Sequence, residues 1–112
     1  MAFQRITPTR LAQAASTTGF LAIYTCPSGT RTYVKDITVC NTTDGAVTVF
    51  VSLVPDQGAV GTANALFSGL SIAANTIFQW KGTQILNAAE TIHFKGGATG
   101  LTIHVSGGEA VD

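Results

Sequence analysis

Two cysteines and two histidines are the side chains of this chain best suited to metal binding or nucleophilic chemistry. Zinc sites usually use paired ligands such as C-x₂-C, and Cys26, Cys40, His93 and His104 form no such pair. A reactive thiolate needs a base beside it in a cleft, whereas both cysteines fall in apolar strand patterns. We therefore expect no catalytic residue, no metal and no cofactor. The histidines are interpreted as solvated residues on the two strands of a final hairpin, whose register decides whether they share a face.

The charged residues also lack a chemical pattern. Six Asp and Glu residues balance six Lys and Arg residues, and the acidic residues include no pair placed recognisably for acid–base catalysis. The basic residues are scattered, so nucleic acid is not an expected partner. Glycine pairs at 96–97 and 107–108 lack the phosphate-loop pattern and indicate hairpin turns. The chain is expected not to be an enzyme.

Aromatic side chains offer the remaining chemistry, because sugar-binding modules stack exposed Trp and Tyr rings on their ligands. Phe78 and Trp80 share one face of a predicted strand, and Tyr24 and Tyr33 flank a turn. Core packing of the first two and a cross-strand pair of the tyrosines is the favoured interpretation. Carbohydrate or receptor binding through Tyr24, Tyr33 and Trp80 is the alternative function.

Charge is scarce over the whole chain. Charged residues make 11% of its 112 residues, against roughly a quarter in typical globular domains. A folded monomer of 11.6 kDa exposes on the order of 5,800 Å², which leaves about 500 Å² for each charge. Because the mean hydropathy is +0.33, we expect neighbouring subunits to cover much of this surface.

The first residues, Met1–Arg5, lack the apolar segment of a secretory signal, and no apolar run approaches the ~20 residues that span a bilayer. We therefore expect synthesis in a cytoplasm and no membrane partner. In that compartment, free buried thiols are favoured over a disulfide. The glycosylation-like Asn41-Thr42-Thr43 is then interpreted as part of a turn.

Period-two patterns and turn residues recur along the chain, and no long helix is indicated. The clearest stripe is Val47, Val49, Val51 and Leu53, which we assign to the core. The expected strands are Phe3–Thr7, Gly19–Cys26, Thr30–Asn41, Ala46–Val54, Leu66–Ile72, Thr76–Trp80, Thr91–Phe94 and Leu101–Val105. About eight short strands predict an all-β, single antiparallel β-sandwich that is jelly-roll-like.

Two segments are assigned to contacts with partners. Residues 1–18 are expected to form an N-terminal arm or edge strand that packs on a neighbour, ahead of a sandwich domain at 19–112. Within this arm, Pro8 favours an edge or a bend, and Arg10–Ser16 fits either a strand or a helical turn. The long loop Pro55–Ala65 is the second segment. The predicted contact residues are Phe3, Arg5, Ile6, Pro8, Arg10, Asp56 and Asn64.

Several short runs, in this order, resemble small β-sandwich virion proteins of tailed bacteriophages. These runs are Arg5-Ile6-Thr7-Pro8, Tyr24–Arg31, Val34–Thr42, Gly61–Leu66, Gln79–Gly82, Ile85–Ala88 and Val105-Ser106-Gly107. The resemblance covers nearly the whole chain. One departure is Ala89-Glu90, where similar chains often place Gly-Asp, so a turn there loses its permissive glycine.

The resemblance implies a non-enzymatic structural component of a bacteriophage particle, such as a capsid decoration, head-fibre or tail-associated protein. It also implies a homo-oligomer, with a trimer favoured because such particles have threefold positions. Major capsid or tail proteins are the other expected partners. The expected location is the virion, assembled in the cytoplasm of a bacterial host.

Overall fold

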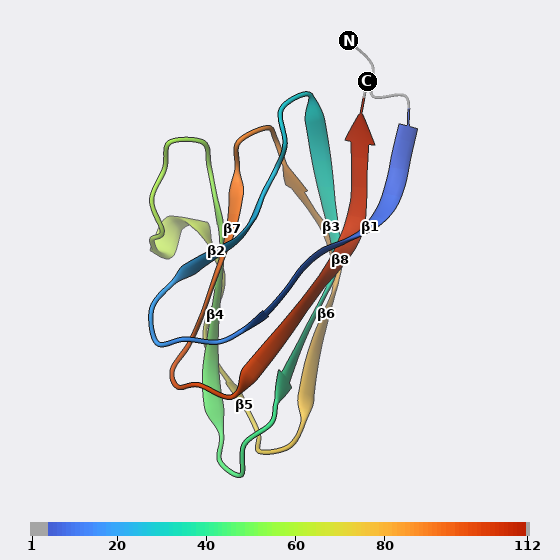
Figure 1. The fold of residues 1–112 in the computed structure, drawn as a ribbon. Coiled ribbons are helices and arrows are strands. Elements are labelled where there is room, and N and C mark those ends of the chain that lie inside the picture. The colour runs from blue at the N-terminus through green and yellow to red at the C-terminus, as the bar shows by residue number, and fades with distance from the viewer. Residues whose placement is uncertain (1–4, 112) are drawn as a thin grey trace.

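The computed structural model describes residues 5–111, which form two four-stranded sheets packed face to face (Figure 1). One sheet has the strand order β1-β8-β3-β6 and is called the β1 sheet; the other has the order β2-β7-β4-β5 and is called the β2 sheet. The strands are β1 (Arg5–Ala15), β2 (Leu21–Thr25), β3 (Thr30–Asn41), β4 (Val47–Val54), β5 (Ala65–Ile72), β6 (Ile77–Leu86), β7 (Thr91–Gly96) and β8 (Leu101–Val111). A single 3₁₀ turn, η1 (Thr62–Asn64), precedes β5.

The strand order is that of a jelly roll. Every connection passes from one sheet to the other except the one between β4 and β5, and the paired strands are antiparallel. Such interleaving of eight strands in two sheets distinguishes a jelly roll from a stack of hairpins. The predicted all-β sandwich is confirmed. Its accessible surface of 5831 Å² agrees with the value expected for a compact monomer of this mass.

The core lies between the sheets and follows the alternation of the strands. Ile37 and Val39 on β3 are fully buried, while Thr38 between them faces outward, as the pattern predicts. On β4 the predicted stripe is confirmed: its three valines are buried, and Leu53 is half-buried and packs against the core. Ser52 pairs with His93 on the outer side of the β2 sheet and is buried there.

Several predicted local pairings are wrong. The strands before and after the Pro27-Ser28-Gly29 turn belong to different sheets, so Tyr24 and Tyr33 form no cross-strand pair. Likewise β7 and β8 form no hairpin, and the Gly107-Gly108 pair lies inside β8 instead of in a turn. A turn sequence permits a chain reversal, but it does not decide whether the next strand joins the same sheet or the opposite one.

Three strands, β1, β6 and β8, extend at least five residues beyond their predicted lengths. β1 runs as one strand through Pro8. An edge strand tolerates proline, because the side without a neighbouring strand needs no N–H donor. β6 and β8 continue past Lys81 and Gly107, where polar and glycine residues suggested ends. The pairing of β8 with β3 continues past a bulge at Lys35 of β3, and the pairing of β6 with β3 continues past an extra residue of β6 at Gly82–Thr83.

The turn Asn87–Glu90 contains a strained residue. The Glu90 N–H donates to the Asn87 carbonyl at 3.1 Å, and Ala89, at the third position, has φ +70°. Glycine is favoured there because an L side chain at positive φ costs about 1–2 kcal/mol. We expect Ala89→Gly to raise the free energy of unfolding by roughly 0.5–1 kcal/mol after the entropic cost of glycine. Urea unfolding measures this, and Ala88→Gly is the control that should not stabilise.

Candidate interaction site on the outer face of the β1 sheet

An apolar row crosses all four strands of the β1 sheet on its outer face. Register pairs Pro8 of β1 with Gly108 of β8, Gly108 with Tyr33 of β3, and Tyr33 with Ile85 of β6. Residues paired across antiparallel strands point to the same side of a sheet. Ile85 is 43% exposed, and Ile6, two residues before Pro8, is 60% exposed. The row therefore presents apolar side chains to solvent.

A shallow hollow of about 490 Å³ lies in this row. Its lining residues are Ile6, Pro8, Tyr33, Lys35, Thr83, Gly107 and Gly108. Gly108 forms part of the floor, and a Cβ there would approach the Ile6 Cγ2 to 2.9 Å. The hollow exists because β8 lacks a side chain at the centre of the row. We call it the β1-sheet hollow.

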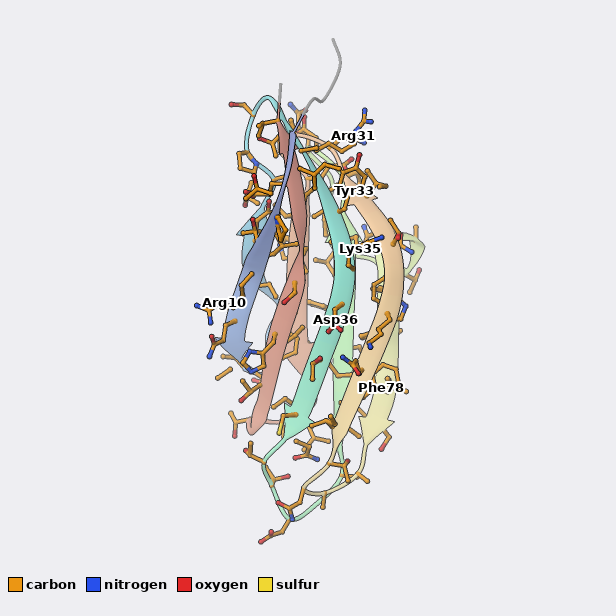
Figure 2. The ribbon with its side chains drawn as sticks, turned by 90° about the vertical axis from the view of Figure 1, so that its right-hand side faces the viewer. Arg10, Arg31, Tyr33, Lys35, Asp36 and Phe78 are labelled. Atoms are coloured by element: carbon orange, nitrogen blue, oxygen red, sulfur yellow. The ribbon has the colours of Figure 1, made fainter. Side chains whose placement is uncertain are left out.

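Polar residues border the β1-sheet hollow on its β3 and β6 side. The Lys35 Nζ donates to the Thr83 Oγ1 at 2.8 Å. Farther along the same face, Asp36 accepts hydrogen bonds from the Gln79 Nε2 at 2.7 Å and the Thr38 Oγ1 at 2.9 Å. Figure 2 looks onto this face and shows Tyr33 and Lys35 above Asp36 on β3. An apolar centre with a hydrogen-bonded polar rim is the usual anatomy of a protein interface.

The predicted contact residues fall on different parts of the molecule. Ile6 and Pro8 line the β1-sheet hollow, whereas Arg10 lines a second hollow beside β1. The Arg5 backbone pairs with Val111 of β8 in the same chain. Phe3 lies outside the described residues.

The two remaining contact residues lie on the loop between β4 and β5. Asp56 is exposed there. Asn64 is held within the loop, since its Oδ1 accepts from the Gly61 N–H at 3.2 Å and its Nδ2 donates to the Ala59 carbonyl at 2.9 Å. Asn64 lines a hollow of about 450 Å³ that is distinct from the β1-sheet hollow. Sequence reasoning therefore grouped residues that belong to separate surfaces.

The three aromatic residues proposed for glycan stacking have unequal access to solvent. Trp80 is half-buried and packs against the core, as the favoured interpretation predicted. Tyr24 points between the sheets. Its hydroxyl donates to the Glu109 Oε2 at 2.5 Å and lies 2.7 Å from the Thr32 Oγ1. Of the three, Tyr33 is the one that lines the β1-sheet hollow, and glycan binding stays a prediction for it.

The Tyr24 hydroxyl connects the two sheets and responds to pH. Burial, and then the hydrogen bond donated to Glu109, raise the pKa of Tyr24 well above its ordinary value of 10.0. Above pH 10 the unfolded chain loses this proton while the folded chain keeps it. Stability from this group is therefore complete below pH 10 and is lost as the pH rises further. The free energy of unfolding, measured with urea between pH 8 and about pH 11, should show this decline. Tyr24→Phe should remove the part of the decline that comes from the Tyr24 hydroxyl proton.

The histidines and cysteines do not meet. His93 lies on β7 between two residues that face the core, so it faces outward from the β2 sheet, with its Nδ1 3.2 Å from the Thr91 Oγ1. His104 lies on the outer face of the β1 sheet, opposite Thr38. Cys26 is buried and Cys40 is half-buried, and both are free thiols. Within residues 5–111, no three His, Cys, Asp or Glu side chains gather as metal ligands.

No helix among the described residues is long and apolar enough to cross a membrane.

Sequence reasoning missed Ile85 and the glycine floor of the hollow. The signal for Ile85 is its position beside Leu86, because one of two adjacent apolar residues on a strand must face away from the core. Leu86 is 1% exposed, so Ile85 takes the outward position. Gly108 carried no comparable signal, since its role depends on which strands flank β8.

Two solved virus structures contain chains with a similar fold. A chain of the infectious bursal disease virus Gx strain structure superposes with a TM-score of 0.52 at 10% identity, over 96% of this chain and 32% of that chain. A chain of the T13 IBDV viral particle superposes with a TM-score of 0.52 at 9% identity, over 96% of this chain and 30% of that chain. A chain of the disulfide-linked pili that form Bacillus endospore appendages has a TM-score of 0.49 at 15% identity, over 99% of this chain and 94% of that chain.

The virus comparisons show a likeness of fold. The chain spans about a third of the length of these virus chains. No protein-family model matches it, and no curated protein sequence matches it. The jelly roll of this chain is therefore similar to a fold found in a virus particle, and the assignment to tailed bacteriophages stays a prediction.

Proposed function

We propose that this protein is a non-enzymatic structural component of a bacteriophage virion, either a capsid decoration protein or a part of a fibre or tail. Its partners are copies of itself and other virion proteins, such as major capsid or tail proteins. The observation that carries this proposal is the exposed apolar row across the β1 sheet, with Ile6 60% and Ile85 43% exposed, on a chain with 11% charged residues. Apolar surface of this kind is typical of proteins that work in contact with others.

The outer face of the β1 sheet is large enough for such a contact. It has four strands, the longest of which are 11 and 12 residues long. At about 4.8 Å between strands and 3.3 Å per residue, the face measures roughly 700 Å². A standard interface covers about 800 Å² on each partner. Burial of this face alone supplies most of one such contact.

A cyclic trimer is the arrangement we propose for the copies. The row is asymmetric, with Ile6 and Pro8 on the β1 side and Ile85 on the β6 side. A head-to-tail interface joins two different patches, here the Ile6 and Pro8 side of one copy and the Ile85 side of the next, and closes into a ring when the rotation between copies allows. Such a ring fits a threefold position of a virion assembled in a bacterial cytoplasm.

The test changes Ile85 to lysine and measures the mass of the oligomer by sedimentation velocity. A charge in an apolar contact should raise its dissociation constant at least about 100-fold. Leu21→Lys is the matched control, because Leu21 is 42% exposed, nearly as much as Ile85, but lies on β2 of the opposite sheet. A variant Ile85→Lys with the mass of the unmodified protein at every concentration contradicts this role for the row.

A further inference from the structure

The four edge strands of the sandwich are unequally protected against pairing with another chain. β1 and β6 are the edges of the β1 sheet, and β2 and β5 are the edges of the β2 sheet. The outer side of an edge strand carries free N–H and C=O groups that can pair with another strand. Natural proteins block such edges with charge, proline, bulges or short length.

Three of the edges carry these devices. β6 has Lys81 near its middle, followed by Gly82 and Thr83, which have no partners on β3. β2 has five residues and a register shift before Tyr24. β5 has two register shifts in its pairing with β4 and a glycine with φ +74° at Gly69. On β2 and β5 no regularly paired, uncharged run exceeds three residues. On β6 the regular run Ile77–Trp80 is uncharged but carries bulky side chains and ends at Lys81.

The fourth edge strand, β1, is protected only in its N-terminal half. Pro8, Arg10 and a register shift between Arg10 and Ala12 interrupt the N-terminal part of β1. After the shift, Ala12–Ala15 pairs regularly with β8. We call residues 11–15, Leu-Ala-Gln-Ala-Ala, the edge segment. It contains no charge, no proline and no glycine.

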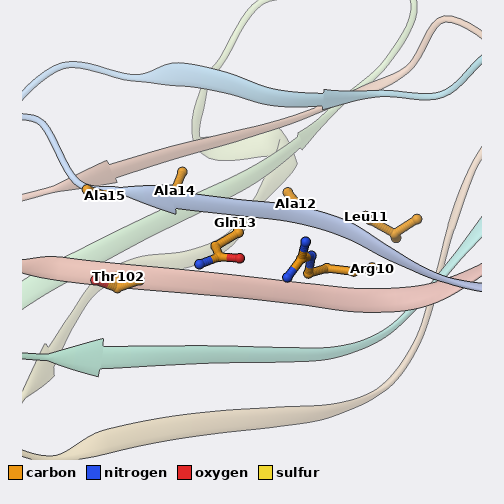
Figure 3. A pocket seen from close by; sticks show the side chains of 7 residues that line it. All are labelled: Arg10, Leu11, Ala12, Gln13, Ala14, Ala15 and Thr102. Atoms are coloured by element: carbon orange, nitrogen blue, oxygen red, sulfur yellow. The ribbon is translucent and has the colours of Figure 1, made fainter.

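Open space lies beside the edge segment. A hollow of about 640 Å³ is lined by Arg10, all five residues of the edge segment and Thr102 of β8. Figure 3 shows these side chains, most of which are short. Gln13 and Ala15 are exposed, Ala14 is half-buried, and Leu11 and Ala12 are buried. Over residues 12–15 the side chains beside the hollow are those of three alanines and one glutamine.

We propose that the edge segment pairs antiparallel with the edge segment of a second copy, about a twofold axis at Gln13. This register places Gln13 opposite Gln13 of the second copy, Ala12 opposite Ala14, and Leu11 opposite Ala15. No charged side chain enters the pairing. The two Gln13 amides can bond to each other across the axis, because each carries a donor and an acceptor. The two β1 sheets then form one continuous sheet of eight strands.

This inference rests on the proposed structural role and adds a second contact to it. Five paired residues bury less than a stable interface requires. The contact gains strength when several copies held in one ring meet several copies in another. The edge segment thus links neighbouring rings, whereas the β1-sheet hollow closes a single ring.

The first test uses cysteine cross-linking. In the proposed register, Gln13→Cys places two thiols directly opposite each other, within reach of a disulfide. Ala15→Cys is the matched control: Ala15 is also exposed on β1, but the two copies of that thiol would lie about 13 Å apart along the strands. Under mild oxidation we expect Gln13→Cys to form disulfide-linked dimers at least about tenfold faster than Ala15→Cys. Equal rates overturn the proposed register.

The second test uses charge. Gln13→Lys and Gln13→Glu should each weaken edge pairing, because each places like charges opposite each other. An equimolar mixture should restore it as a mixed pair, detected as an increase in mass by sedimentation velocity. A mixture with the same mass as either variant alone contradicts a twofold axis at Gln13. If the edge tests fail while Ile85→Lys still dissociates the ring, the edge inference alone is lost.

Discussion

Replacing Gly107 with alanine should destabilise the fold by about 3 kcal/mol or more. A Cβ at this position would overlap the backbone carbonyl oxygen of Tyr33 and would lie 3.3 Å from the Lys35 nitrogen. Both atoms belong to β3, which is paired with β8 along its length. A backbone atom in a sheet cannot rotate away as a side chain can, so the strands must separate or the bulge at Lys35 must rearrange.

Chemical denaturation of three glycine variants measures this effect. Gly108→Ala is expected to cost less than Gly107→Ala, because its new Cβ meets the Ile6 side chain at 2.9 Å, and that side chain can move. Gly45→Ala is the neutral control, since no atom lies within 4 Å of the added carbon. Equal unfolding midpoints for the variants at 107 and 45 would show that the two strands are not packed as described.

Replacing Asn41 with alanine should lower the free energy of unfolding by about 3 kcal/mol. Asn41 is fully buried at the end of β3. Its Nδ2 donates to the carbonyls of Gly45 and Ile72, each at 2.9 Å. Its Oδ1 accepts from the Thr43 N–H at 2.9 Å and the Thr43 Oγ1 at 2.7 Å. The side chain ties the β1 sheet to β5 of the opposite sheet, and its loss leaves buried polar groups without partners.

Urea unfolding provides the measurement, with Thr42→Ala as the control. Thr42 is the next residue, and its exposed hydroxyl makes a hydrogen bond to the Gly100 carbonyl at 2.8 Å. Water can replace that bond, so Thr42→Ala should cost less than about 1 kcal/mol. Similar losses for the two variants would mean that Asn41 does not hold the sheets together. Asn41 is thus buried at the end of β3, and Thr42 and Thr43 lie in the connection to β4.

The alternation of apolar residues was sufficient to predict the burial of most strands. The bounds of β3, Thr30–Asn41, agree with the prediction, and Ile37 and Val39 face the core. The pattern reports which side of a strand is buried, whatever its neighbours are. Strand pairing is a different property. The Pro27–Gly29 turn fits a hairpin as well as a corner of the sandwich, so the sequence alone could not assign β2 and β3 to opposite sheets.

The β1-sheet hollow depends on strand pairing, which the sequence alone could not assign. Its central row joins Pro8, Gly108, Tyr33 and Ile85, which are far apart in the sequence and meet through three strand registers. Ile6 and Pro8 were predicted as contact residues from their position in the N-terminal segment. Their apolar neighbours on β3 and β6 became recognisable once β8 was placed between β1 and β3.

Light scattering of the unmodified protein over a concentration series tests the central claim most directly, since that claim is association through a charge-poor surface. We predict a mass of three chains of 11.6 kDa each at low concentration, increasing at high concentration as rings pair through their edge segments. A mass of one chain at every concentration would contradict the proposal that copies of this protein cover the outer face of the β1 sheet.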